Sequence, residues 1–148
     1  MAIERTANVV WQGDLLSGKG TVSASSSGVF ADLPVTWAAR TESPGGMTSP
    51  EELIAAAHAS CYAMACSHAL ASAGNPPERL AVRAVVRFDP KVGGGFEVSE
   101  SKLTVWGRVP GLDQAGFADL ARKGEQGCPV SNALRGNVQI HLDAILES

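Results

Sequence analysis

One segment restricts the possible folds more than any other. It is SPEELIAAAHASCYAMACSHALASAG, residues 49–74, in which almost every position between the two ends is small or apolar. Ser49 predicts an N-cap, Pro50 suits the first helical position, and Glu52 completes a capping box. Gly74, followed by NPP, predicts the end of the helix. A helix that is apolar on all faces is buried on all faces, so we expect a long central helix.

On both sides of this helix the chain has the alternating pattern of strands. Before it we expect strands in NVVWQG, SGKGTVSAS and LPVTWAAR, and after it a long hairpin in LAVRAVVRFDP and GFEVSESKLTVWGRVPG. DQAGFADLARKGEQG and CPVSNAL predict two further helices, and NVQIHLDAIL predicts a closing strand. This order indicates a single α+β domain over residues 1–148, with an antiparallel sheet wrapped around the buried central helix. So small a domain cannot cover that helix alone, and dimerisation would supply the cover.

Composition excludes several classes of function. Apolar residues make up 45% of the chain and charged residues 18%, which is typical of a globular protein. A net charge of −3 gives no basic surface for nucleic acid or an anionic membrane. No signal peptide and no uncharged stretch of about 18 apolar residues is evident, so we expect a cytoplasmic location. Three cysteines, an odd number, argue against a disulfide scaffold in a reducing compartment.

Two of the cysteines lie on the predicted central helix. Cys61 and Cys66 are five residues apart, so their side chains point about 140° apart and cannot share one site. Cys66 is interpreted as a small apolar residue of the core. A metal site would need His58 and His68 as well, but His68 lies about 10 Å along the axis from Cys61, and the spacing matches no zinc motif. We therefore expect no metal.

The third cysteine has a different setting. Cys128 precedes Pro129 at a predicted helix start, where free backbone N–H groups stabilise a thiolate. Gly127 before it permits close approach of another segment. From these residues alone, a cysteine that only caps the helix remains an alternative.

These residues resemble a known family. SPEELIAAAHASCYAMA, with VTWAAR upstream and GCPVSNAL downstream, is similar to the OsmC/Ohr family of osmotically inducible and organic hydroperoxide resistance proteins. The forms WAAR and SGKG favour the OsmC branch. The resemblance implies an intertwined homodimer and a cofactor-free thiol peroxidase for organic hydroperoxides. It also implies Cys61 as the reactive cysteine, Cys128 as the second redox cysteine, and Arg40 and Glu51 as assisting residues.

The chemistry explains why such residues are needed. A buried cysteine is only slightly ionised near neutral pH, so a cation such as Arg40 must stabilise the Cys61 thiolate, and Glu51 would orient the guanidinium. Glu51 lies about 15 Å from Cys61 along one helix, which favours a partner subunit whose Glu51 comes close. Cys61 would become a sulfenic acid, condense with Cys128, and be restored by an external dithiol, for which the family suggests a lipoyl type.

Two other functions are compatible with these residues. One is a hydrolase with Cys61 as nucleophile and His58 or His141 as base, which would not need Cys128. The other is a non-catalytic stress-related binding or carrier protein, which would not need Arg40 or Glu51.

Overall fold

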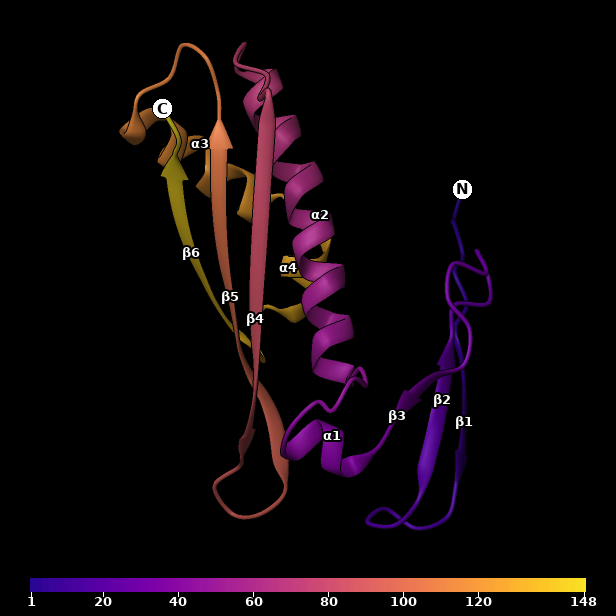
Figure 1. Ribbon diagram of the computed structural model, residues 1–148. Helices are drawn as coiled ribbons and strands as arrows, with labels where there is room; N and C mark the ends of the chain where they lie inside the picture. Colours follow the sequence, from indigo (N-terminus) through magenta and orange to yellow (C-terminus); the bar gives the residue numbers. More distant parts are fainter. The chain divides into compact units, whose positions relative to one another are not determined.

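The computed structural model describes residues 1–148, and its internal contacts divide the chain into two compact units, Met1–Leu53 and Ile54–Ser148. The prediction of one domain over the whole chain stays a prediction. Figure 1 shows the helices and strands, which in chain order are β1 (Asn8–Gln12), β2 (Lys19–Ser23), β3 (Leu33–Val35), α1 (Trp37–Thr41), α2 (Pro50–Ser72), β4 (Arg79–Pro90), β5 (Phe96–Arg108), α3 (Gln114–Gln126), α4 (Pro129–Leu134) and β6 (Gln139–Leu146).

The first unit contains an antiparallel sheet in the order β1-β2-β3. Gly20 in the middle strand pairs with Trp11 on one side and Val35 on the other. A Cβ atom at Gly20 would lie 2.7 Å from Cε3 of Trp11, so only glycine lets the indole pack over the strand. The three strands predicted in this part of the chain are therefore present.

The segment VTWAAR was predicted as the end of a strand, and this is wrong for its last residues. The strand β3 ends at Val35, and Thr36 then caps the short helix α1. The backbone N–H of Ala39 donates to Thr36 Oγ1 at 3.1 Å, which satisfies one of the free donors at the helix start. Arg40 consequently lies in the last turn of a helix and not in a strand.

The helix α2 begins and ends as the sequence predicts. The backbone N–H of Glu52 donates to Ser49 Oγ at 3.2 Å, so Ser49 is the N-cap. The carboxylate of Glu52 accepts from the Thr48 hydroxyl at 2.8 Å, so the reciprocal half of the capping box is not formed. The helix ends at Ser72, and Gly74 follows with φ +87°, which favours glycine.

The expectation that α2 is buried on all faces is wrong for the single chain. After Glu51 in its first turn, the fully buried residues form one stripe at every fourth position, which comprises His58, Tyr62, Cys66 and Leu70. On another face, Met64 is 70% exposed. By length and mean hydropathy α2 also meets the criterion for a membrane span, which the sequence analysis did not expect. The core helix of a soluble protein meets the same criterion.

The second unit contains a sheet in the order β4-β5-β6. The long hairpin of β4 and β5 is antiparallel, as predicted, with an irregular register between Arg87 and Phe88. The closing strand β6 runs parallel to β5, so the prediction of an antiparallel sheet is wrong at this pair. Parallel neighbours need a crossover connection, and α3 and α4 provide it between β5 and β6.

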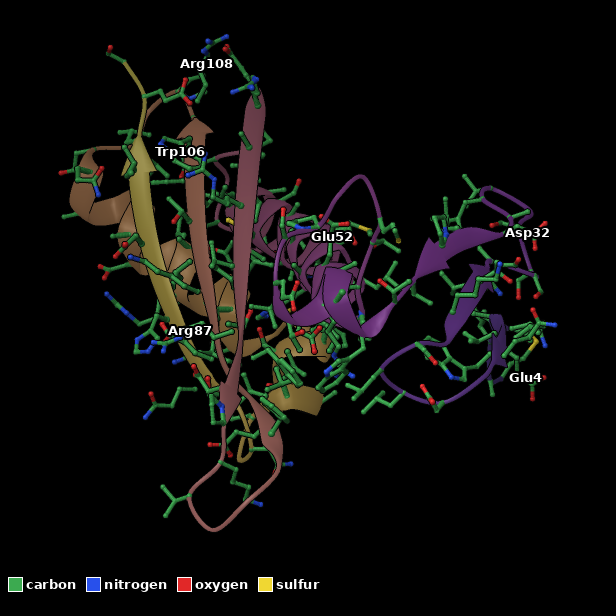
Figure 2. All side chains as sticks on the ribbon, turned by 60° about the horizontal axis from the view of Figure 1, so that its bottom comes forward. Glu4, Asp32, Glu52, Arg87, Trp106 and Arg108 are labelled. Atoms are coloured by element: carbon green, nitrogen blue, oxygen red, sulfur yellow. The ribbon has the colours of Figure 1, made fainter.

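The two faces of this sheet differ in chemistry. On the inner face, Leu103 and Val105 are fully buried and join one core with residues of α2 and α3, namely Tyr62, Cys66, Leu70, Phe117 and Ala121. The outer face carries Arg87 and Trp106, which are labelled in Figure 2. The Arg83 guanidinium lies 5.4 Å from the Trp106 ring centroid there. The period of two predicted for these strands is therefore confirmed.

Candidate functional site

In the first unit, Arg40 and Glu51 form an ion pair. Arg40 Nη2 lies 2.8 Å from Glu51 Oε1, and Arg40 Nε lies 2.9 Å and 3.2 Å from the two carboxylate oxygens. Glu51 is buried and lies in the first turn of α2, where the helix dipole favours a carboxylate. The Arg40 guanidinium also lies 5.9 Å from the Trp37 ring centroid. A guanidinium held in this way is oriented and can stabilise an anion.

An apolar cavity of about 540 Å³ borders this ion pair within the first unit. Arg40 contributes the charged group of its lining. The other lining residues are mostly aliphatic or aromatic and comprise Val9, Trp11, Leu15, Val22, Val35, Thr36, Trp37, Pro50 and Leu53. The cavity therefore offers an apolar chain a binding surface beside one cation.

In the second unit, the thiols of Cys61 and Cys128 lie close enough together for Cys128 to raise the pKa of Cys61. Cys61 lies on α2 and is partly exposed, whereas Cys128 is fully buried. The backbone N–H of Val130, in the first turn of α4, also lies near Cys61 and opposes the rise in its pKa. Two cysteines that are far apart in the sequence are thus direct neighbours, and both are free thiols.

The pKa of Cys61 is raised in this setting. Burial is the main cause, and the thiol of Cys128 raises the pKa further through its hydrogen bond and its charge. The hydrogen bond from Val130 opposes them and lowers the pKa. No cationic side chain of the second unit is among these causes. The positive charge that a reactive thiolate needs is not supplied by the residues that surround Cys61 within this unit.

Cys128 occupies the N-cap of α4, as the sequence predicts. Its sulfur accepts from the backbone N–H of Ser131 at 3.4 Å. Its own backbone N–H donates to Glu125 O at 3.2 Å, at the end of α3. The Glu125 carboxylate in turn binds the Arg135 guanidinium at 2.9 Å and 3.0 Å, so the segment around Cys128 is held at both ends.

His58 lies beside these cysteines in a buried polar network that the sequence analysis missed. His58 is fully buried, with Nδ1 at 2.7 Å from Ser101 Oγ and Nε2 at 2.7 Å from Ser131 Oγ. Burial lowers its pKa, so the ring is neutral near pH 7. His58 is therefore a core histidine. The sequence around Ser101 and around Ser131 contains no motif that predicts a contact with His58. Such partners could have been expected only because a buried histidine needs a hydrogen-bond partner for each ring nitrogen.

The remaining cysteine and histidines lie elsewhere. Cys66 is fully buried beside Tyr62, and burial raises the pKa of its thiol. This confirms its interpretation as a core residue. His68 is exposed on α2, and His141 is exposed on β6 at 3.6 Å from Glu100. No group of three or more His, Cys, Asp or Glu side chains is arranged to hold a metal ion.

Of the four residues singled out in the sequence, the structure forms two pairs. Arg40 contacts Glu51 in the first unit, and Cys61 contacts Cys128 in the second. One pair holds an oriented cation beside an apolar cavity, and the other holds two thiols in contact.

The chain resembles known proteins in both its sequence and its structure. Residues 43–143 match the family model described as OsmC-like protein. The chain is 41% identical over 148 residues, the full length of both chains, to peroxiredoxin OsmC of Escherichia coli strain K12. It is 36% identical over 104 residues, 66% of this chain and 67% of the relative, to an organic hydroperoxide resistance protein of Xanthomonas axonopodis pv. citri.

Two solved structures that resemble this chain are also of organic hydroperoxide resistance proteins. The organic hydroperoxide resistance protein OhrB of Bacillus subtilis has a TM-score of 0.75 at 26% identity, with 94% of this chain and 97% of that chain covered. An organic hydroperoxide resistance protein OsmC from Legionella pneumophila has a TM-score of 0.70 at 27% identity, with 98% and 99% covered.

Proposed function

The chain belongs to the family of OsmC-like proteins, and on that premise we propose that it is a thiol-dependent peroxidase that reduces organic hydroperoxides to alcohols. The observation that carries the proposal is the close approach of the Cys61 and Cys128 thiols, which lie far apart in the sequence and together at the edge of one core. A peroxidase that works with two cysteines needs its second thiol within reach of the oxidised one. A hydrolase needs no such second thiol.

In the first step, the Cys61 thiolate attacks the O–O bond of the hydroperoxide. The sulfur is oxidised to a sulfenic acid, the O–O bond breaks, and the alkoxide leaves as an alcohol after taking up a proton. Only the thiolate is nucleophilic, and burial raises the pKa of Cys61, so a cation must face it during the reaction. Arg40 is the proposed cation, held by Glu51, and its N–H groups would also donate to the peroxide oxygens.

In the second step, the Cys128 sulfur attacks the sulfur of the Cys61 sulfenic acid. The S–S bond forms, the S–O bond breaks, and the oxygen leaves as water with the proton of the Cys128 thiol. Both cysteines are then oxidised as one disulfide. An external dithiol, of which a lipoyl type is one example, restores the two thiols by exchange. No cofactor and no metal take part in this scheme.

The apolar cavity beside Arg40 supports an organic substrate. Each methylene group that leaves water for an apolar surface contributes about 0.8 kcal/mol, which hydrogen peroxide cannot gain. Trp11, Leu15 and Leu53 contribute to the wall of this cavity. We therefore expect higher efficiency with alkyl or lipid-like hydroperoxides than with hydrogen peroxide, and equal efficiency would contradict this preference.

The proposed active form is an intertwined homodimer in the cytoplasm, with its sites at the subunit interface. Large apolar side chains on the surface of the single chain support an oligomer: Val9 is 60% exposed, Leu16 79% and Met64 70%. In a symmetric dimer, an Arg40–Glu51 pair could serve a Cys61 on either subunit. The molar mass in solution, measured by light scattering, tests the dimer.

The experiment that tests the function is intact-mass analysis of the reduced protein after one equivalent of cumene hydroperoxide. We expect a loss of about 2 Da, because disulfide formation removes two hydrogen atoms, and peptide mapping should place the link between Cys61 and Cys128. Cys128→Ser should instead retain one oxygen atom on Cys61. The control Cys66→Ala removes a cysteine outside the proposed site and should still form the link. An unchanged mass of the wild-type protein would overturn the peroxidase proposal in favour of a hydrolase or a carrier.

A further inference from the structure

We propose that His58 is a positioning residue for disulfide formation, and that it acts through Ser131 on the turn that carries Cys128. The inference rests on the proposed two-cysteine reaction and concerns its second step alone.

The hydrogen bonds of His58 join three different elements. The ring lies on α2, its Nδ1 lies 2.7 Å from Ser101 Oγ on β5, and its Nε2 lies 2.7 Å from Ser131 Oγ on α4. All three side chains are fully buried. Hydrogen bonds in such an environment are stronger than at the surface, and breaking one leaves a buried polar group without its partner. The network therefore ties α4 to α2 and to the sheet.

Ser131 links this network to the sulfur atoms. Its hydroxyl binds His58, and its backbone N–H donates to Cys128 Sγ at 3.4 Å. One residue earlier, the backbone N–H of Val130 lies near Cys61 and opposes the rise in the pKa of its thiol. The first turn of α4 thus presents neighbouring N–H groups to the two sulfurs. A displacement of Ser131 would move first the N–H group that donates to Cys128.

The rate of disulfide formation depends on where the turn of α4 holds the Cys128 sulfur. The Cys128 sulfur must approach the Cys61 sulfenic acid in line with the S–O bond that breaks, and it forms the S–S bond as water leaves. The helix α4 has only six residues, so few internal hydrogen bonds hold its first turn in place. The ion pair of Glu125 and Arg135 holds the flanking segments, and His58 holds the turn itself. Holding two reacting groups in the productive geometry raises the rate of their reaction.

The two sides of the ring provide a matched comparison. Ser131→Ala and Ser101→Ala each remove one buried hydroxyl from His58, but only Ser131 contacts Cys128. A purely structural role of His58 predicts similar effects of the two variants. A positioning role predicts that Ser131→Ala slows disulfide formation and that Ser101→Ala does not.

The neutral ring allows a second comparison. With one N–H and one acceptor nitrogen, His58 can be replaced in part by an amide. Glutamine places its amide near the position of Nε2 and can still reach Ser131, whereas asparagine places it near Nδ1 and can reach only Ser101. We expect His58→Gln to retain most of the rate of disulfide formation and His58→Asn to lose it, so that the conservative variant rescues the step.

The experiment is a single turnover with one equivalent of cumene hydroperoxide, quenched at intervals by acid and analysed by intact mass. It separates the loss of the reduced form from the conversion of the sulfenic acid to the disulfide. We expect disulfide formation about tenfold slower in Ser131→Ala than in Ser101→Ala, the size of one lost buried hydrogen bond, and a smaller effect on sulfenic acid formation in all four variants. Equal rates of disulfide formation in these two variants would overturn the inference while the peroxidase proposal stands. A wild-type protein that forms no disulfide would overturn both.

Discussion

Gly124 marks the closest approach between α3 and α2, and replacing it tests the packing beneath the cysteines. A Cβ atom at Gly124 would lie 2.8 Å from Cys66 Cα, 3.1 Å from Cys66 N and 3.3 Å from Cys66 Cβ. Carbon atoms at rest lie about 3.5–4.0 Å apart, so the two helices would have to separate by roughly 1 Å. Because the opposing atoms belong largely to the backbone, no side-chain rotation can relieve the contact.

The expected effect of Gly124→Ala is the balance of two terms. Alanine in a helix interior is favoured over glycine by about 1 kcal/mol. Overpacking a closed core costs about 1–3 kcal/mol, and a rigid backbone contact belongs at the upper end of that range. The free energy of unfolding should therefore fall by about 2 kcal/mol, against the direction of helix propensity.

Urea unfolding followed by circular dichroism measures this change. The control is Gly127→Ala, three residues further along, where the nearest atom to an added Cβ is Lys123 O at 3.6 Å and φ is −92°. Any residue can adopt that conformation, so the control should unfold near the wild-type midpoint. If Gly124→Ala is as stable as Gly127→Ala, the close packing of α3 on Cys66 does not hold in solution and the reasoning is refuted.

Three further outcomes are expected. Arg40→Lys should slow oxidation of Cys61 by roughly 10- to 100-fold, because an ammonium group cannot make the two-point contact of a guanidinium. Glu51→Gln should slow it less, because Arg40 keeps its guanidinium but is less well oriented. If the single-turnover rate of Arg40→Lys equals that of the wild-type protein, Arg40 does not belong to the site. Burial lowers the pKa of His58, so the unfolded chain binds a proton that the folded chain does not, and the free energy of unfolding should decrease as the pH falls below about 6.5. The slope from this group is at most about 1.4 kcal/mol per pH unit, and a His58→Gln variant that keeps the full pH dependence would contradict the assignment. Tyr62→Phe should lower the free energy of unfolding by about 1 kcal/mol, because the hydroxyl donates to a buried backbone carbonyl at 3.0 Å, and leave the peroxidase rate unchanged in the same assays.

Much of the local structure could be predicted because its causes are local. The N-cap of α2 at Ser49, its end before Gly74 and the cap at Cys128 all depend on residues within one turn. The alternation of β5 is likewise a property of neighbouring residues. The prediction was wrong at the segment that contains Arg40, since a single hydroxyl at Thr36 was enough to start a helix where the apolar pattern indicated a strand.

The amino-acid sequence by itself determined the kinds of groups that this protein can use. They are a long helix with one cysteine on each of two faces and a glutamate in its first turn, a third cysteine at a helix start, and an arginine upstream of the long helix. Only the tertiary structure decided which of them meet. The crossover through α3 and α4, which also makes β6 parallel to β5, brings Cys128 close to Cys61. The same crossover places Ser131 where His58 can hydrogen-bond both to it and to Ser101. Such contacts join residues that lie far apart in the chain, and no local propensity or periodicity encodes them. They form when the core is buried, and in the resulting arrangement every buried side-chain nitrogen and oxygen atom has a hydrogen-bond partner.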